Sequence, residues 1–166
     1  FLKPDAVFAP GATTLTSTGF EFSSSPDVIR DAVAALKARC PGTKVLAAVG
    51  GAAYNNWGAL DAPAIARVVQ YLGLDGVDVD YEVTPSCTLD VAAGSVACST
   101  DAQLTGAINA LRAALPRPYL VTAASFSVGA YGLGAFANAV PGSTYTGMWI
   151  NPLKRAGTAL DRLFVM

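Results

Sequence analysis

The hydrophobic and polar residues of the chain form short apolar runs that alternate with segments of helical periodicity. Apolar runs of strand length occupy residues 5–9, 44–51, 74–82, 119–125, 146–150 and 162–166. Apolar positions three and four residues apart predict helices over 25–42, 61–73 and 99–116, a short helix near 132–139, and another after residue 152. This alternation indicates an α/β fold with a parallel sheet, in a barrel or in an open doubly wound form.

The first predicted helix has the clearest boundaries. Ser25 is a typical N-cap residue, Pro26 suits the first helical position, and Pro41 followed by Gly42 ends the helix. The apolar stripe that we expect this helix to bury consists of Val28, Ile29, Ala32, Val33 and Leu36. Asp61 is placed to cap the second helix in the same way.

Residues 74–82, with the sequence LDGVDVDYE, combine a strand pattern with an unusual density of carboxylates. Four of the twelve acidic residues of the chain lie here. Side chains on a strand alternate between faces, with neighbours on one face about 7 Å apart, so Asp78, Asp80 and Glu82 share a face. Carboxylates stacked in this way raise one another's pKa values and titrate as a coupled set. Such an environment suits a general acid that stays protonated near neutral pH.

Composition narrows the chemistry that these acids can perform. The chain has 166 residues, is 52% hydrophobic and 14% charged, and carries a formal net charge of -1, which fits one domain with a sizeable core. Lysines and arginines form no basic run, so we expect no nucleic-acid partner. The absence of histidine excludes Ser-His and Cys-His catalysis and histidine-ligated metals. The uncharged stretch after Arg117 is broken by glycines and serines, so we expect no membrane span.

The three cysteines leave two interpretations open. A disulfide between Cys87 and Cys98 would close the polar loop 88–97 and imply an oxidising compartment. Three unlinked thiols, including Cys40, fit the odd count equally well. The chain begins at Phe1 without a signal-peptide pattern, so we expect any such peptide to lie outside it, and the cysteine pair is the ground for expecting a secreted, extracellular protein.

The spacing of the acids, Asp75-x-x-Asp78-x-Asp80-x-Glu82, resembles the signature of the family 18 glycoside hydrolases, which are chitinases and endo-β-N-acetylglucosaminidases. All four acidic positions match that signature. Residues 48–51, with the sequence AVGG, resemble a second motif of the family, Ser-x-Gly-Gly at the end of the third strand. An alanine replaces the serine here, so one hydroxyl partner of the acids is missing.

The resemblance implies a (β/α)8 TIM barrel, for which about 250 residues are typical. We therefore expect residues 1–166 to be a fragment of a single catalytic domain, a partial barrel with roughly strands 2 to 6 of eight and with open sheet edges. In this alignment residues 5–9 form the second strand and residues 162–166 the sixth. Residues 146–150 are left as an insertion or an irregular segment.

The resemblance also implies a mechanism. In this family the 2-acetamido group of the substrate is the nucleophile, and configuration at the anomeric carbon is retained. Glu82 would be the general acid and later the general base, Asp80 would orient the acetamido group, and Asp78 would share a proton with Asp80. Asp75 points to the other face of the strand and is expected to be structural. The mechanism needs no metal and no cofactor.

The implied substrate is chitin or another oligosaccharide of N-acetylglucosamine, and the implied protein is a chitinase, although we expect the fragment alone to be inactive. Gly50 and Gly51 lie at a strand end, where active sites of parallel folds occur and where missing side chains let a ligand or a neighbouring strand approach. A tight turn would require the same glycines. Tyr54 and Trp57 follow them and are candidates to stack on a sugar ring, or to be buried as aromatic residues commonly are.

Five other interpretations of the acidic strand remain. A non-catalytic lectin or inhibitor on the same fold usually loses the acid glutamate, which this chain keeps as Glu82. An endo-β-N-acetylglucosaminidase would act on N-glycans. The carboxylates could hold calcium or magnesium, or the Asp78-x-Asp80 pair could serve a magnesium-dependent phosphatase, but no phosphate-binding partner is evident. A purely structural acidic strand is disfavoured because burial of uncompensated carboxylates is costly.

Overall fold

The structure is a computed structural model that describes residues 1–90, 92–131 and 142–166. Helices and strands alternate along the chain, as the sequence predicted. The elements before residue 90 are α1 (Pro26–Arg39), β1 (Leu46–Gly50), the short 3-10 helix η1 (Trp57–Ala59), α2 (Ala62–Tyr71), β2 (Gly76–Asp80) and β3 (Cys87–Asp90). The later ones are β4 (Ser95–Cys98), α3 (Asp101–Ala114), β5 (Leu120–Ser125), η2 (Ser127–Ala130), α4 (Ile150–Ala156), η4 (Gly157–Ala159) and β6 (Arg162–Val165).

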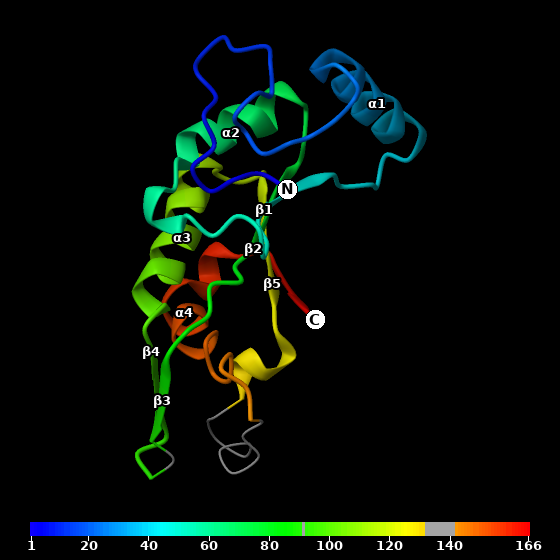
Figure 1. Cartoon of the computed structure of the whole chain (residues 1–166). Coiled ribbons are helices and arrows are strands. Elements are labelled where there is room, and N and C mark those ends of the chain that lie inside the picture. The colour runs from blue at the N-terminus through cyan, green and yellow to red at the C-terminus, as the bar shows by residue number, and fades with distance from the viewer. Residues whose placement is uncertain (91, 132–141) are drawn as a thin grey trace.

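The main sheet is parallel and has the strand order β1-β2-β5-β6. Its central strands are buried on both faces, and α2, α3 and α4 lie together along one face (Figure 1). The strands predicted within 44–51, 74–82, 119–125 and 162–166 are thus confirmed. The largest fully buried side chains of the core include Trp149, Tyr81, Leu2, Ile65, Leu72, Leu104, Ile108, Leu111, Leu115 and Met148.

The prediction of a strand at residues 5–9 is wrong. The segment that pairs with β1 is Leu2, whose backbone N–H donates to Ala48 at 2.7 Å and whose carbonyl accepts from Gly50 at 3.0 Å. Pro4 follows two residues later, and a proline has no N–H with which to extend a strand ladder. The chain therefore turns at residues 4–5, and residues 6–9 run without strand structure.

The first helix forms where predicted but does not pack as predicted. Ser25 caps it by accepting from the N–H of Val28 at 3.5 Å. None of its residues is fully buried. Ile29 and Val33 of the expected apolar stripe pack partly buried against the core, whereas Val28 and Leu36 are 56% and 44% exposed. In Figure 1, α1 stands apart from the other helices. By contrast, α2 is capped by Asp61 and buries its apolar side as expected.

Within the stretch 88–97, expected to be a loop, residues 88–90 and 95–97 pair in an antiparallel hairpin of β3 and β4. A disulfide joins Cys87 and Cys98, which face each other across the hairpin, so the disulfide interpretation of the sequence is the one that the structure adopts. Cys40 is a free, exposed thiol. Residues 146–149 are turns that lead into α4, in line with their assignment as irregular, while the helix expected near 132–139 lies outside the described residues.

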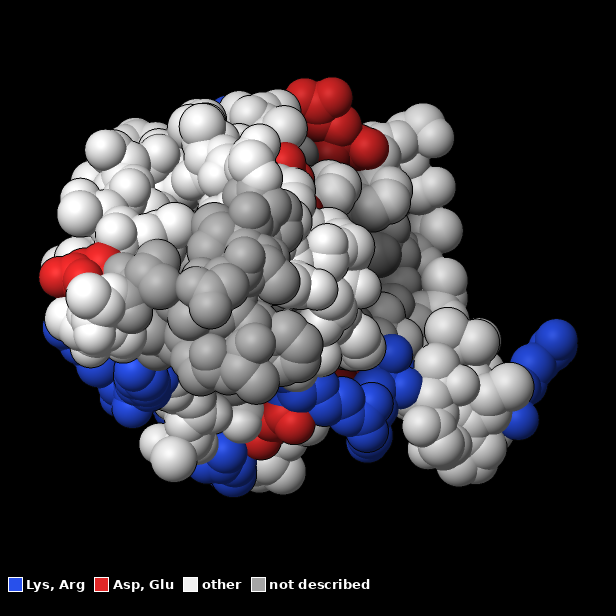
Figure 2. Space-filling view, turned by 90° about the horizontal axis from the view of Figure 1, so that it is seen from below, with Lys and Arg blue, Asp and Glu red and all other residues white. Residues whose placement is uncertain are grey.

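The surface carries two features that bear on partners. No helix within the described residues is long and apolar enough to cross a membrane. Figure 2 views the molecule from the end at which β5 runs into η2, and the lysines and arginines on this face form separate groups rather than a continuous band. β6 pairs with β5 along one side, and its residues Phe164 and Val165 are 48% and 67% exposed.

The close approach of β2 and β5 depends on a glycine. A Cβ atom at Gly76 would lie 1.9 Å from the carbonyl oxygen of Leu120, a distance that real Cβ atoms essentially never show. We expect Gly76→Ala to lower the free energy of unfolding by more than about 3 kcal/mol, because the two strands must separate. Gly106→Ala, in α3 with nothing within 4 Å of the added carbon, should instead raise it by up to about 1 kcal/mol. Urea unfolding of both variants tests this, and similar midpoints would contradict it.

Candidate active site

The parallel register brings the acidic strand and the glycine pair together at one edge of the sheet. Gly50 of β1 is in register with Asp80 of β2, which is in register with Ala124 of β5. The N–H of Gly51 donates to the carbonyl oxygen of Asp80 at 2.7 Å. β2 ends at Asp80, so Glu82 projects just beyond the end of the strand. This is the C-terminal edge, where parallel α/β folds place their active sites.

Both glycines are required by the geometry of this edge. A Cβ at Gly50 would lie 2.3 Å from the carbonyl oxygen of Asp80 and 2.5 Å from the ring of Trp57, and the φ angle of Gly50 is +102°. The φ angle of Gly51 is +79°, also in the region that favours glycine. The first glycine therefore allows a close contact between strands rather than contact with a ligand. Gly51 lines a pocket.

Asp78 is held by a threonine that the sequence analysis did not single out. Thr122 of β5 is the register partner of Asp78, and its hydroxyl donates to a carboxylate oxygen of Asp78. Ala48 is the register partner on the other side, where the family motif has a serine. The hydroxyl missing from Ala48 thus has a counterpart on β5. Burial raises the pKa of Asp78, and the hydrogen bond from Thr122, which lowers it, only partly offsets that rise.

Asp80 is the most deeply buried of the three acids. Its side chain is 9% exposed, and its Oδ1 atom has no hydrogen-bond partner among the described residues. Burial raises the pKa of Asp80, and the negative charges of Glu82 and Asp78 raise it further. A buried oxygen without a donor is uncommon in folded proteins and is costly to keep. The Oδ1 atom of Asp80 can therefore accept a hydrogen bond from a donor on a bound molecule.

The side chain of Glu82 borders a pocket of about 520 Å³ at the end of the strand. The pocket is lined by small residues on one side, by aromatic side chains at its margin and by two carboxylates: Phe1, Gly19, Glu21, Gly50, Gly51, Ala52, Ala53, Tyr54 and Glu82. Asp80 lies close beneath it, since a Cβ at Gly51 would be 3.6 Å from Oδ2 of Asp80. Glu82 thus borders the cavity directly, and Asp80 lies beneath its floor.

Tyr54 and Trp57, the two aromatic candidates, occupy different positions relative to the pocket. Tyr54 lines the pocket, with its hydroxyl donating to the carbonyl of Gly19 at 3.3 Å. Trp57 is only 3% exposed and packs against Tyr81 with ring centroids 5.1 Å apart. Burial of Trp57 is the alternative that the sequence left open, and Trp57 is not among the residues that line the pocket. The absence of a side chain at Gly50 leaves room for its ring beneath the strand end.

Asp75 lies at the opposite end of β2 and is fully engaged there. It accepts from the N–H of Val45 at 2.8 Å and forms ion pairs with Lys37 at 3.0 Å and Lys44 at 3.5 Å. Burial alone would raise the pKa of Asp75, but the Val45 hydrogen bond and the two ammonium groups outweigh it and hold the pKa below its usual value. These contacts fit the structural role expected for Asp75.

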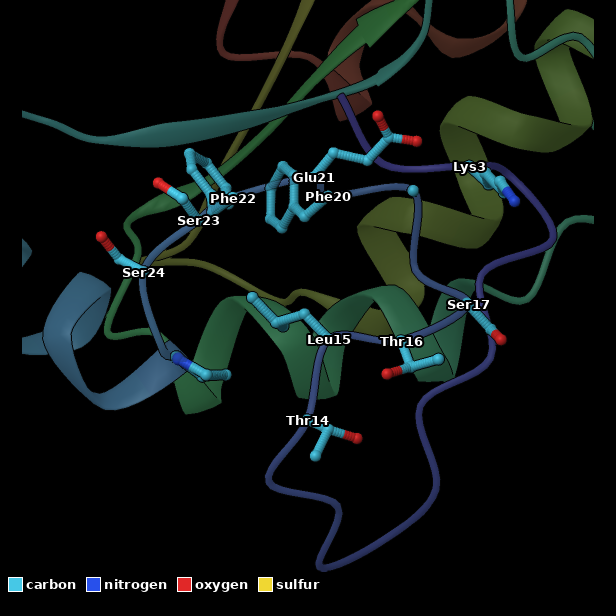
Figure 3. Close-up of a pocket in the computed structure, with 12 residues that line it drawn as sticks. Lys3, Thr14, Leu15, Thr16, Ser17, Phe20, Glu21, Phe22, Ser23 and Ser24 are labelled. Atoms are coloured by element: carbon cyan, nitrogen blue, oxygen red, sulfur yellow. The ribbon is translucent and has the colours of Figure 1, made fainter.

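Glu21 is the pocket residue that the sequence analysis missed. Residues 10–24 have neither helical nor strand periodicity, so no pattern placed this loop against the acidic strand. Its one signal is rarity, because Glu21 and Glu82 are the only glutamates of the chain. Glu21 also borders a second pocket of about 720 Å³, shown in Figure 3, so the two cavities adjoin.

The described residues contain no group of three or more acids or cysteines arranged to hold a metal ion.

Comparisons with known proteins give a clear result for the fold. Neither a family model nor a curated protein sequence matches the chain. Solved structures do. A chitinase of glycoside hydrolase family 18 (GH18) from Pseudoalteromonas aurantia has a TM-score of 0.63 and 24% identity over 98% of this chain and 54% of its own. A putative chitinase A from Streptomyces coelicolor has a TM-score of 0.55 and 21% identity, covering 98% of this chain and 46% of that one.

A chitinase from Rhizomucor miehei matches with a TM-score of 0.57 and 19% identity over all of this chain and 48% of its own. A class V chitinase from Nicotiana tobaccum, solved in complex with NAG4, matches with a TM-score of 0.55 and 18% identity over 96% of this chain and 42% of its own. This chain thus spans about half the length of the structures that it matches. Its fold is α/β, with four parallel strands that correspond to part of the GH18 TIM barrel.

The raised pKa of Asp80 gives a signed prediction for stability. A carboxyl group that binds its proton more tightly in the folded state favours folding at low pH, and that contribution is lost as the pH rises above about 4 through the folded-state pKa. We expect Asp80→Asn to unfold at a higher temperature than the parent at pH 7, with the gain disappearing near pH 3. Thermal unfolding at both pH values measures it, and a variant less stable than the parent at pH 7 would refute it.

Proposed function

We propose that the chain belongs to GH18 and that its protein is a chitinase, which hydrolyses β-1,4-linked N-acetylglucosamine polymers with retention of configuration. One observation carries the proposal. Of the three carboxylates that share a strand face, Glu82 borders a pocket at the C-terminal edge of the sheet, and Asp80 lies beneath the floor of that pocket with an oxygen that has no hydrogen-bond donor among the described residues. The likeness to chitinase structures supports the same conclusion through the fold.

In this mechanism Glu82 carries the proton. It is half-buried at the wall of the pocket, where it can reach a glycosidic oxygen bound against the small residues of the floor. Glu82 protonates that oxygen as the bond breaks, and the resulting carboxylate later takes a proton from the attacking water. A residue at the end of a strand suits this exchange, because it is in contact with both the cavity and the acidic face behind it.

Asp80 and Asp78 act on the acetamido group of the sugar. The amide N–H of that group is the kind of donor that Oδ1 of Asp80 lacks, and a hydrogen bond there turns the acetamido oxygen toward the anomeric carbon. Ionised Asp80 then stabilises the positive charge of the cyclic oxazolinium intermediate. Asp78, fixed by Thr122, takes up the proton that Asp80 releases. No metal or cofactor is needed for any of these steps.

Two further observations support the substrate class and the location. Chitinases from Nicotiana tobaccum and Cycas revoluta, which share this fold, were solved with N-acetylglucosamine tetramers, so oligomers of that sugar are the proposed ligand here. The Cys87–Cys98 disulfide supports secretion, because such bonds persist in oxidising compartments.

The test is hydrolysis of N-acetylglucosamine oligosaccharides by the protein at its full encoded length. Glu82→Gln should lower kcat by roughly 10²- to 10⁴-fold with little change in ligand affinity, since the amide keeps the shape and loses the proton. Asp31→Asn, which removes an equal charge from the exposed surface of α1, is the matched control and should retain activity. Product analysis by mass spectrometry in ¹⁸O-labelled water and NMR of the first-formed anomer test retention.

The outcomes separate the candidates. Binding without cleavage by the parent would favour a lectin on the same fold. Cleavage of N-glycan cores in place of chitin oligosaccharides would favour an endo-β-N-acetylglucosaminidase. Equal activity of the parent and Glu82→Gln would remove Glu82 from the mechanism and with it the proposal.

A further inference from the structure

The pocket beside Glu82 contains a second carboxylate that the proposed mechanism does not use. Glu21 and Glu82 are 61 residues apart in the sequence, and the loop before α1 carries Glu21 to the same cavity. Figure 3 shows the Glu21 side chain extending away from the Thr14–Ser17 segment and away from the rings of Phe20 and Phe22. Glu21 thus lines both the pocket of that figure and the one that contains Glu82.

Glu21 has no partner in the fold to account for its position. The described residues offer it neither a hydrogen bond nor an ion pair. Lys3 borders only the neighbouring pocket, where its ammonium group lies over the ring of Tyr54, 5.6 Å from the centroid. A structural role would require contacts that Glu21 does not make.

The side-chain charges around the pocket have one sign. No lysine or arginine is among its lining residues, while Glu21 and Glu82 both border it and Asp80 lies 3.6 Å below the floor position at Gly51. Asp80 is also nine-tenths buried, with an oxygen that lacks a donor. Two independent features of this cavity thus call for a ligand that brings hydrogen-bond donors and positive charge.

A polymer of N-acetylglucosamine is neutral and supplies no such charge, but its N-deacetylated form carries an ammonium group on each glucosamine unit. We propose that Glu21 binds the ammonium group of a glucosamine unit next to the sugar that reacts at Glu82. The inference rests on the proposed function and narrows its substrate to partly deacetylated chitin. The reacting unit itself must keep its acetyl group, because that group is the nucleophile.

The reacting N-acetylglucosamine unit and the neighbouring glucosamine unit bind to different parts of the site. Asp80 meets the acetamido group in a buried position, whereas Glu21 meets the ammonium group at an exposed margin of the pocket. A charge-assisted hydrogen bond is about twice as strong as a neutral one, but exposure to water reduces its worth. We therefore expect a preference of roughly three- to tenfold rather than an absolute requirement.

The experiment compares two hexasaccharides with the protein at its full encoded length, one fully acetylated and one partly deacetylated. The parent should show a higher kcat/KM for the deacetylated substrate, and Glu21→Gln should lower the ratio of the two values by roughly three- to tenfold. Asp31→Asn makes the same change in net charge away from the pocket and should leave the ratio unaltered. Raising the pH until the sugar amine is neutral should remove the preference of the parent and leave that of Glu21→Gln unchanged.

The results distinguish a failure of this inference from a failure of the proposed function. If the parent cleaves both substrates and Glu21→Gln leaves the ratio unchanged, the Glu21 assignment is wrong and the hydrolase stands. If neither substrate is cleaved, calorimetric titration of both sugars with the parent and Glu21→Gln decides. A preference for the deacetylated sugar that depends on Glu21 then supports the inference without the hydrolase, and equal or absent binding overturns it.

Discussion

The contact between the ends of β1 and β2 determines the site. Gly50 has no side chain, so the backbone of β1 comes close enough to β2 for the N–H of Gly51 to bond the carbonyl of Asp80 at 2.7 Å. Any Cβ at Gly50 would meet that carbonyl at 2.3 Å and push the strands apart. With the strands fixed, parallel register places Glu82 above Asp80, and the small residues after Gly50 leave the cavity in front of both.

The carboxylates at the two ends of the sheet have opposite environments and opposite pKa shifts. Asp75 and Asp161 precede β2 and β6; each accepts a backbone N–H from a neighbouring segment and pairs with basic side chains, and each has a pKa held below its usual value despite the opposing effect of burial. At the other end Asp78 and Asp80 face no cation, and their pKa values are raised by burial first. The paired end therefore contributes to stability, and the unpaired end is where the proposed chemistry would take place, as expected where function opposes stability.

Periodicity predicted most of this fold but little of the pocket wall. The apolar runs and caps located β2, β5, α2 and the shared face of the acids, because these features repeat within a few residues. The edge pairing of Leu2, the burial of Trp57 and the position of Glu21 depend on contacts between distant segments, which no local pattern encodes. The apolar stripe of α1 misled for a related reason: a stripe predicts a helix, but burial also needs a surface to pack against.

Because α1 is weakly anchored, one wall of the cavity is less rigid than the sheet that carries the acids. None of the side chains of α1 is fully buried. Ile29 and Val33 pack partly buried against the core, and polar contacts link Lys37 to Gly73 and Asp75 and link Asp27 to Tyr71. A segment with so few buried contacts opens at a small fraction of the global unfolding free energy, and its amide protons should exchange with solvent early. Pro26, at the start of α1, belongs to the wall of the cavity that adjoins Glu21. That wall is therefore compliant, and under the proposed function it would adapt to the sugar units of a heterogeneous polymer while the acids of β2 stay fixed in the sheet.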